Sequence, residues 1–325
     1  IDIAKAKQYC DDSIQLAEKL KYKKGLSRGV VLLANIYFDK GQYKQSLELN
    51  HRGLALREEL GDEHGVAAVY GNIGNVYKMM NQIDKSLEYQ LLSLEKFRTL
   101  NSINPNDDDA FDIAVCLLDI GGIYKGQNKY EEAMKSFREA LALFEKLKHR
   151  QSIASAYSGM GDVYYRMNNI KPAVDYNLKA LAIYDEMKDK QGISNVYLNL
   201  ANISMNAGDN DRAIQYLNNS LLAAQEISLK DNIKIAYELF ANLYDKKGDY
   251  RIAYEYHKLY SELKDSLLNI ESSKQITEMQ TNYQTAQQEP PITLLNNDNV
   301  IQQVTLHRPT TSPCTVARRL LLVLR

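Results

Sequence analysis

A tyrosine-centred motif recurs along the chain at a nearly constant spacing, and this repeat constrains the fold more than any other feature. The motif reads LANIYFDKGQYKQSLE at 33–48 and IGNVYKMMNQIDKSLE at 73–88. With the tyrosine as reference position, the six copies carry Tyr37, Tyr77, Tyr124, Tyr164, Ser204 and Tyr244. The steps are 40, 47, 40, 40 and 40 residues, and the long step contains the insertion NSINPNDDD at 101–109. Self-similarity at this period predicts a stacked repeat array.

Other columns of the repeat predict a helix around the reference position. Three residues before it the chain always has Gly or Ala: Ala34, Gly74, Gly121, Gly161, Ala201 and Ala241. Four residues before it stand large apolar residues: Leu33, Ile73, Ile120, Met160, Leu200 and Phe240. Nine residues after it the side chain is again small: Ser46, Ser86, Ala133, Ala173, Ala213 and Ala253. Offsets of −4, −3 and 0 share one face of a helix, so this face is expected to pack closely on a neighbour.

The first helix of each copy is expected to stop four residues after the reference position. Gly or Asn stands there in every copy: Gly41, Asn81, Asn128, Asn168, Gly208 and Gly248. These two residue types best tolerate the left-handed conformation that caps a helix. A second apolar-periodic stretch follows, for example YEEAMKSFREALALFEKL at 130–147. Each copy therefore predicts a helix–turn–helix unit, and the chain is expected to be all-α.

These columns resemble the tetratricopeptide repeat (TPR), in its long 40-residue form similar to that of kinesin light chain. The resemblance implies a right-handed α-solenoid with first helices on a concave wall and second helices outside. It implies six units, at about 23–62, 63–109, 110–149, 150–189, 190–229 and 230–269. Residues 1–22 align with a second helix only, because SIQLAEKLKYKKG matches ALAIYDEMKDKQG, so the chain is expected to start within a repeat.

Recurrent asparagines on the first helices are the main candidates for a binding site. Asn is a poor residue inside a helix, because its side chain competes for backbone hydrogen bonds. In the resembled family, asparagines at this position line the groove and bind the backbone of an extended peptide. The corresponding groove residues here are Asn35, Asn72, Asn75, Asp162, Asn199, Asn202 and Asn242. The alternative is that these amides tie adjacent helices together.

Basic residues on the same helices are candidates for contacting acidic groups of a ligand. They are Arg28, Lys78, Lys125 and Arg166, and the acidic residues Asp119 and Asp162 lie among them. The alternative is that they are solvated surface charges. The full set of clamp residues of the resembled family does not align with this chain, so a ligand held by its C-terminal carboxylate is not expected.

The sequence shows no pattern that indicates catalysis, a metal or a cofactor. The five histidines lack metal-ligand spacing, and Cys10, Cys116 and Cys314 form no C-x-x-C pair. The segment NPNDDDAFD at 104–112 lacks the Gly and Glu of a calcium loop, and its aspartates are expected to cap a helix beginning near Ala110. A net charge of −1 and 25% charged residues do not favour nucleic-acid binding. A non-catalytic protein without cofactors is expected.

The segment after residue 250 differs from the array. The prediction is an exit helix over 270–289 and a poorly ordered tail over 290–325. The apolar spacing of Leu259, Leu263, Leu267, Ile276 and Tyr283 suits a partner helix, so a homodimer through this helix is one expectation. HKLYSELKDSLLN and KQITEMQTNYQ resemble the exit helix of TPR sensor regions in Bacteroidetes-like signalling histidine kinases.

Two functions remain open from the sequence. One is the sensory region of a bacterial signal-transduction protein that binds a protein or peptide in its groove. The other is a stand-alone adaptor that assembles a protein complex. No membrane span is expected within the chain, because the longest apolar run is LLLVL at 320–324. The location stays open between the cytoplasm and an extracytoplasmic, membrane-tethered site.

Overall fold

The computed structural model describes residues 3–267, which form helices and tight turns and no β-strand. Twelve helices are bounded as follows: α1 Ile3–Lys19, α2 Lys23–Asp39, α3 Tyr43–Glu59, α4 Glu63–Met79, α5 Ile83–Ile103, α6 Asp107–Gly126, α7 Tyr130–Lys146, α8 Arg150–Arg166, α9 Ile170–Met187, α10 Lys190–Asn206, α11 Asn210–Glu226 and α12 Lys230–Lys247. A further helix covers 250–267. The predicted exit helix at 270–289 and the tail at 290–325 lie outside the described residues.

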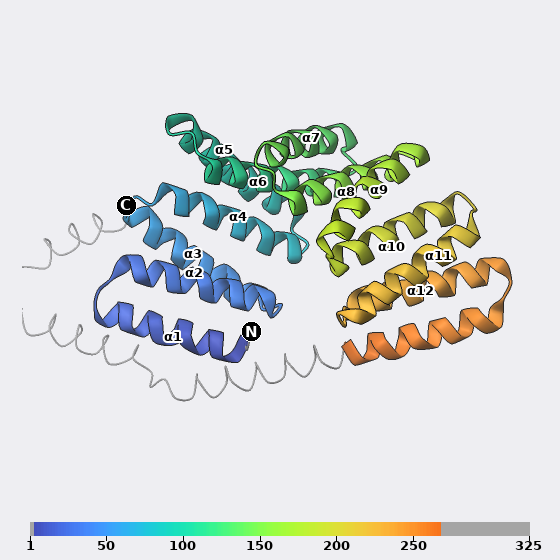
Figure 1. Cartoon of the computed structure of the whole chain (residues 1–325). Coiled ribbons are helices and arrows are strands. Elements are labelled where there is room, and N and C mark those ends of the chain that lie inside the picture. The colour runs from blue at the N-terminus through green and yellow to red at the C-terminus, as the bar shows by residue number, and fades with distance from the viewer. Residues whose placement is uncertain (1–2, 268–325) are drawn as a thin grey trace, which may run out of the picture. The chain divides into compact units, whose positions relative to one another are not determined.

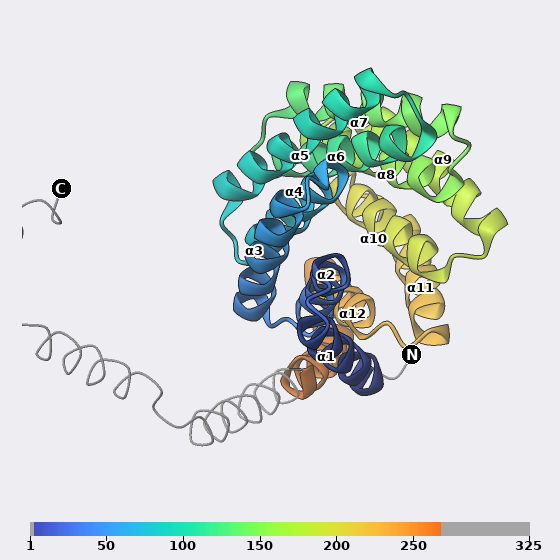
Figure 2. The same cartoon turned by 90° about the vertical axis from the view of Figure 1, so that its left-hand side faces the viewer.

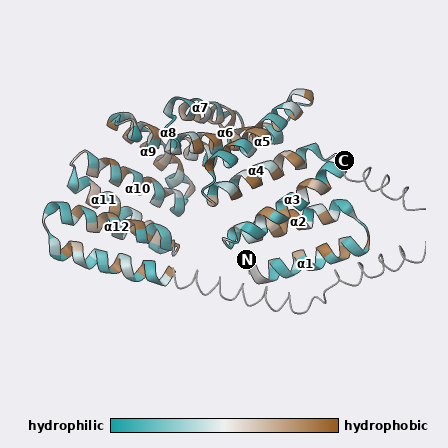
Figure 3. Ribbon diagram, turned by 180° about the vertical axis from the view of Figure 1, so that it is seen from behind, coloured by the Kyte–Doolittle hydropathy of each residue, from teal (hydrophilic) through white to brown (hydrophobic). Residues whose placement is uncertain are grey.

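The chain divides into two compact units, Ile1–Tyr260 and Ser261–Arg325. The first unit contains α1–α12 and the helical residues 250–260, and the fold is described for this unit (Figure 1). Of the second unit, residues 261–267 are described and are helical. Each helix carries both hydrophilic and hydrophobic residues along its length, as expected for helices with one buried face (Figure 3).

Helices of the first unit pack as consecutive antiparallel pairs. Each even-numbered helix from α2 to α10 packs on the odd-numbered helices before and after it, and α12 packs on α11. First helices of successive units also approach one another directly, in the pairs α2–α4, α6–α8, α8–α10 and α10–α12. Figure 2 shows the even-numbered helices along the inner side of this unit, with α3, α5, α7, α9 and α11 outside them. This arrangement confirms the all-α repeat array.

The turns after the first helices confirm the predicted left-handed caps. All six residues four positions after the reference have positive φ, between 58° and 79°. The turns after the second helices use the same conformation at Lys21, Gly61, Lys148, Lys188 and Ser228. Lysine and serine carry no sequence signal for this conformation, so these second turns were not predictable from residue type.

Small residues recur in the core because the paired helices approach closely. A Cβ atom added at Gly161 would lie 2.4 Å from Asn177 Nδ2, and one at Gly121 would lie 2.8 Å from the Phe137 ring. The small residues nine positions after the reference are almost fully buried in every unit. Branched side chains at these positions would push the two helices of a unit apart.

A cluster of tyrosines joins the two helices in several units. Tyr176 of α9 lies 6.0 Å from Tyr157 and 5.4 Å from Tyr164 of α8, between ring centroids. Tyr89 of α5 contacts Tyr70 and Tyr77 of α4 in the same way, at 6.0 Å and 5.5 Å. The reference tyrosines are therefore half-buried packing residues.

The insertion lengthens α5 and changes the start of α6. The expectation that aspartates cap a helix near Ala110 is wrong in detail, because α6 begins at Asp107 and Asn106 is its N-cap. The Asn106 Oδ1 atom accepts a hydrogen bond from the Asp109 backbone N–H at 2.8 Å. Asp107 and Asp108 lie in the first turn, where their charge favours the positive end of the helix dipole.

Candidate functional site

Polar side chains of the first helices form a continuous set between α4 and α10, which we call the inner wall. Its members are Asn72, Asn75, Lys78, Asp119, Lys125, Asp162, Tyr165, Arg166, Asn195, Asn199, Asn202 and Asn206. Each first helix contributes from the turns before and after its reference position. Because these helices are stacked, the contributions of successive units lie next to one another.

Two ion pairs link successive first helices in the middle of the inner wall. Lys125 Nζ of α6 lies 2.5 Å from Asp162 Oδ2 of α8, and both side chains are 24% exposed. Lys78 Nζ of α4 lies 3.6 Å from Asp119 Oδ1 of α6. Both lysines were expected to contact acidic groups of a ligand, and here each is paired with a carboxylate of the next unit. An acidic ligand group would have to compete with Asp119 or Asp162 for them.

The environment of Asp119 differs from that of an ordinary surface carboxylate. Burial raises the pKa of Asp119 above its usual value, and the nearby Lys78 ammonium opposes this shift. Asp112, about one helical turn after Asp109, also has a raised pKa because it is buried, and His64 lowers it in part. His64 Nε2 lies 3.2 Å from Asp112 Oδ2 and 3.4 Å from Asp109 Oδ1, which links α4 to the start of α6.

Amide side chains link the helices at the two ends of the inner wall. Gln90 Nε2 of α5 donates to Asn75 Oδ1 at 2.9 Å and to the Gly71 carbonyl oxygen at 3.2 Å. Asn199 Nδ2 of α10 donates to Ser158 Oγ and to Asn177 Oδ1, both at 3.3 Å. Asn75 and Asn199 therefore tie helices together, which is the structural alternative weighed above for these amides, and their role towards a ligand stays a proposal.

One face of α10 carries four asparagines, at 195, 199, 202 and 206. Asn206 Nδ2 donates to the Tyr165 hydroxyl of α8 at 2.6 Å. Asn195 Oδ1 accepts from Asn232 Nδ2 of α12 at 2.7 Å. Asn202 Nδ2 donates to the Leu198 carbonyl oxygen of its own helix at 3.2 Å. The spacing of i, i+4, i+7 and i+11 places all four side chains on one helical face.

Sequence reasoning missed three members of the inner wall. Asn195 and Asn206 lie one turn beyond the columns that were compared, and the same helical spacing would have found them. Tyr165 follows directly after the reference residue Tyr164, and its hydroxyl accepts a hydrogen bond from Asn206 Nδ2. The useful signal is the run of asparagines along α10, which a column-by-column comparison of units does not detect.

The remaining predicted residues lie on the outermost first helices or at the edge of the wall. Arg28 and Asn35 on α2, and Asn242 on α12, are exposed. Arg166 is exposed at the C-terminal end of α8. Within residues 3–267, Arg28 and Arg166 form no ion pair, unlike Lys78 and Lys125 of the same predicted set. Asn72 is half-buried on α4, one turn before Asn75.

Metal-ligating and thiol groups are sparse or buried in the described part of the chain. Between residues 3 and 267 no group of three metal-ligating side chains is close enough to hold an ion. Burial raises the pKa of the Cys116 thiol to about 11, so its reactive thiolate is scarce at neutral pH. No helix in the described part of the chain is long and apolar enough to cross a bilayer.

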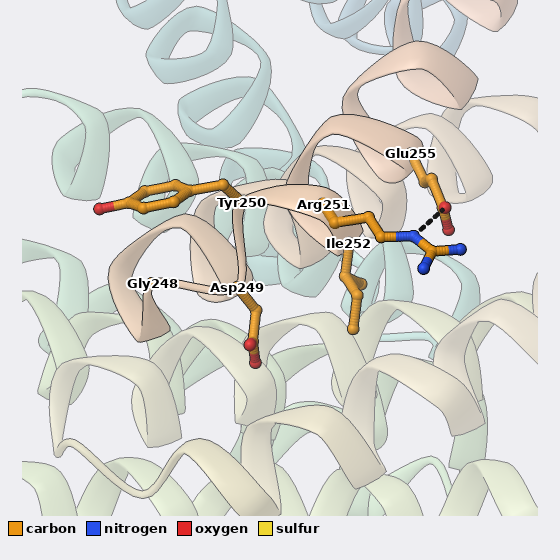
Figure 4. Close-up of a pocket in the computed structure, with 6 residues that line it drawn as sticks. All are labelled: Gly248, Asp249, Tyr250, Arg251, Ile252 and Glu255. Atoms are coloured by element: carbon orange, nitrogen blue, oxygen red, sulfur yellow. Dashed lines mark hydrogen bonds and ion pairs between the residues drawn. The ribbon is translucent and has the colours of Figure 1, made fainter.

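A surface pocket of about 660 Å³ lies at the turn between α12 and the helix at 250–267. It is lined by Gly248, Asp249, Tyr250, Arg251, Ile252 and Glu255. Figure 4 shows Arg251 and Glu255 paired with each other, at 3.4 Å between Nε and Oε1. The lining contains none of the inner-wall residues, and it brings no unpaired buried group together.

The fold and the inner wall define an α-helical repeat protein with an extended polar surface. The chain belongs to the tetratricopeptide repeat family: its profiles match residues 26–99, 109–186 and 194–226. No curated protein matches the sequence closely enough to count as a relative.

Several solved structures share this fold at low sequence identity. BtubC (BKLC) from P. vanneervenii is 21% identical with a TM-score of 0.58, over 70% of this chain and 93% of that one. A Rap protein complexed with competence and sporulation factor is 17% identical with a TM-score of 0.56, over 78% and 80%. The Rap conjugation gene regulator of plasmid pLS20 with the Phr* peptide is 16% identical with a TM-score of 0.55, over 78% of each chain. At these identities the likeness shows the fold alone.

Proposed function

We propose that this protein is a non-catalytic scaffold that binds an extended peptide segment along the inner wall. The observation that carries the proposal is the asparagine face of α10. An amide side chain offers two donors and an acceptor, so it can hydrogen-bond a peptide group of any sequence. Asn202 is half-buried and uses one N–H on its own helix, and its Oδ1 accepts no hydrogen bond within the described residues.

The paired charges in the middle of the wall support a ligand without a strong net charge. Asp119 and Asp162 are neutralised by Lys78 and Lys125, which leaves Arg28 and Arg166 as unpaired cations of the predicted set. A peptide bound mainly through its backbone, with one acidic side chain near Arg166, fits this pattern. Two of the proteins with a similar fold are described in complex with a peptide or with competence and sporulation factor, which motivates the use of peptide probes.

The test is selection from a library of short random linear peptides, followed by affinity measurements on variants of the full chain. Asn202→Ala combined with Arg166→Ala should weaken the selected peptides about tenfold or more, since each lost hydrogen bond is worth about 0.5–1.5 kcal/mol and charged ones more. The matched control is Asn218→Ala with Asn219→Ala, which removes two exposed amides from the second helix α11.

Equal affinities for the two double variants would refute the inner wall as the binding site. Asn75→Ala and Asn199→Ala are unsuitable as first tests, because both also break contacts between helices. A fall in thermal stability would then be mixed with the loss of a ligand contact.

We further propose that the array is the sensory region of a bacterial signal-transduction protein, with a stand-alone adaptor as the alternative. Both use the same wall, and they differ in what the gene encodes after the array. The sensory proposal predicts a membrane span and an output domain in the full gene. The adaptor proposal predicts that the purified array retains partners from a lysate without either.

A further inference from the structure

Arg57 of α3 occupies a repeat position at which the next four units carry an uncharged, buried residue. The position lies twenty residues after the reference position, and its other members are Phe97, Phe144, Tyr184 and Ala224, each at most 7% exposed. Arg57 also takes the same place in space. Its Nη1 atom would lie 2.2 Å from a Cβ atom added at Gly65, as the Tyr184 ring would lie 2.4 Å from one added at Gly192. The Arg57 side chain is 15% exposed, so a permanent cation stands where the array otherwise places core residues.

The charge of Arg57 is incompletely paired. Its Nε atom is buried and has no hydrogen-bond partner within the described residues. Its one ion pair in that part of the chain is with Asp62, at 3.9 Å between Nη1 and Oδ2, which is too long for a hydrogen bond. Asp62 also caps α4, because its Oδ1 atom accepts a hydrogen bond from the Gly65 N–H at 3.0 Å. Burial of a cation with an unpaired N–H costs stability unless a further group pairs with it.

A second arginine, Arg28 of α2, stands at a position that meets the Arg57 column in another unit. Arg28 lies nine residues before the reference position, in the column of Ser155 and of the inner-wall residue Asn195. In the unit of α8 and α9 the two columns are joined by a hydrogen bond, 2.9 Å between Ser155 Oγ and the Tyr184 hydroxyl. In the unit of α2 and α3 both members are cations. Burial lowers the pKa of the Arg57 guanidinium, Asp62 opposes this shift, and the charge of Arg28 lowers the pKa further. Two guanidinium groups at such positions are held together by an anion that lies between them.

The two arginines lie between helices that are all part of the described array. The helices that pack on α3 are α2 and α4, and both are described along their whole length. The column of Arg28 contacts its own second helix through Ser155 and the following first helix through Asn195, which accepts a hydrogen bond from Asn232 of α12. Arg28 itself is exposed. Because it shares a column with the inner wall, a ligand that lies along the wall has access to the pair.

We propose that Arg28 and Arg57 form a subsite for the carboxylate of an acidic side chain of the bound peptide. This inference rests on the proposed function, since it concerns a peptide held along the inner wall. Two guanidinium charges and the Asp62 carboxylate leave one positive charge, so a carboxylate neutralises the subsite, whereas a phosphate dianion leaves it negative. The planar guanidinium group also matches the geometry of a carboxylate. The peptide therefore carries an Asp or Glu in the part that lies over α2, in addition to the acidic residue near Arg166.

The experiment uses the peptides that the random library yields on the full chain. In each peptide, one Asp or Glu at a time is replaced with Asn or Gln, and the affinities of the acid and amide forms are compared. For the acidic residue over α2, the wild-type chain should bind the acid form about tenfold or more tightly, because the amide loses a charge-assisted pair. Arg57→Met should reduce this preference to about twofold or less. The matched control is Arg138→Met, which removes an exposed arginine of the second helix α7 and should leave the preference unchanged.

Thermal stability provides a second readout, which a purely structural arginine would move in the opposite direction. Arg57→Met replaces an incompletely paired, largely buried cation with an apolar side chain of similar length. The melting temperature of this variant should therefore equal or exceed that of the wild type. Arg28→Met keeps the test valid if Arg57→Met does not fold, because Arg28 is exposed. It should reduce the preference for the acid form about threefold or more.

The outcomes distinguish the failure of this subsite from the failure of the proposed function. Peptides that lose affinity with Asn202→Ala and Arg166→Ala, but whose preference for the acid form survives both Arg57→Met and Arg28→Met, would overturn the subsite and leave the proposed function intact. A lower melting temperature of Arg57→Met with an unchanged preference for the acid form would assign Arg57 to a structural pair with Asp62, and would also overturn the subsite.

If the library yields no binder, the proposed function fails and thermal melts with acetate as the probe decide on the subsite. Sodium acetate, compared with sodium chloride at the same ionic strength, should raise the melting temperature of the wild type more than that of Arg57→Met. Equal shifts for the two chains would overturn the subsite.

Discussion

The middle of the inner wall and its α10 segment join neighbouring first helices by different chemistry. Between α4 and α8 the first helices are joined by ion pairs, Lys78–Asp119 and Lys125–Asp162. On α10 the positions of Asp119 and Asp162 carry Asn199 and Asn202, and the position of the two lysines carries Met205. This helix hydrogen-bonds to α8 through Asn199 and Asn206. Both arrangements hold neighbouring first helices together.

The difference lies in what each arrangement leaves for a ligand. An ion pair occupies both charges and must be broken before either group can bind elsewhere. An asparagine that makes one hydrogen bond still has donor and acceptor capacity. On the proposed function, the middle of the wall mainly holds the array together and α10 mainly supplies contacts to the peptide. The following predictions test this division.

The largest expected effect is a loss of stability, and the place where protection is lost should differ between the two regions. Phe240 packs with Leu217 and Leu243 in the cluster formed by α10, α11 and α12. Phe144 packs in the cluster of α5, α6 and α7. Phe240→Ala and Phe144→Ala should each lower the free energy of unfolding by about 3–5 kcal/mol. Because each unit contacts mainly its neighbours, Phe240→Ala should remove hydrogen-exchange protection from α10–α12 first. Uniform loss of protection along the array would show that the two regions do not unfold independently.

A smaller effect compares how much an ion pair and an amide of the inner wall each contribute to stability. Asp162→Ala leaves the half-buried Lys125 without its partner and should cost about 1–2 kcal/mol, between the values for exposed and buried pairs. Asn202→Ala removes a hydrogen bond within one helix and should cost less than about 0.5 kcal/mol. Urea unfolding of both variants measures the difference. Equal costs would remove the distinction between the two regions.

The pH dependence of stability tests the burial of charge at Asp119. Because burial raises its pKa, the folded chain binds this proton more tightly than the unfolded chain. As the pH falls from neutral through the folded-state pKa, the wild type should therefore gain stability relative to Asp119→Asn. At neutral pH the Asn variant should be slightly the more stable, because burial outweighs the attraction of Lys78. Thermal melts between pH 4 and pH 8 measure this, with the exposed Asp211→Asn as control.

The smallest effect concerns turns that are alike in the two regions. Lys148 follows α7 and Ser228 follows α11, at φ 56° and 55°. Replacing either with Gly should raise the free energy of unfolding by about 0.5–1 kcal/mol, because Gly adopts this conformation without the steric cost of a side chain. Lys146→Gly, inside α7, should instead lower it by about 1 kcal/mol. Different gains in unfolding free energy at positions 148 and 228 would show that these turns also differ between the two regions.

Local features of the chain were predictable from its sequence because they depend on neighbouring residues. The helix ends at Gly41, Asn81 and Gly208 follow from residue types that accept positive φ. The close helix pairing follows from small residues in fixed columns, as at Gly161. The register of α1 was also readable, since a left-handed turn follows it where the alignment places one.

Contacts between units were decided by the tertiary structure. The sequence placed Lys78, Lys125, Asp119 and Asp162 on first helices, but which carboxylate each lysine meets depends on the rotation between successive units. The partners of Asn199 and Asn206 lie about one full repeat away, at 41 residues, for the same reason.

The sequence by itself therefore determined the repeat, the all-α class and the positions of helices and turns. The tertiary structure alone decided which polar groups are paired and which keep hydrogen-bonding capacity. The physical reason is the distance along the chain over which each property is determined. Backbone conformation and helix amphipathicity depend on residues within about one turn of helix. Charge pairing and burial depend on atoms that stacking brings together from some 40 residues away.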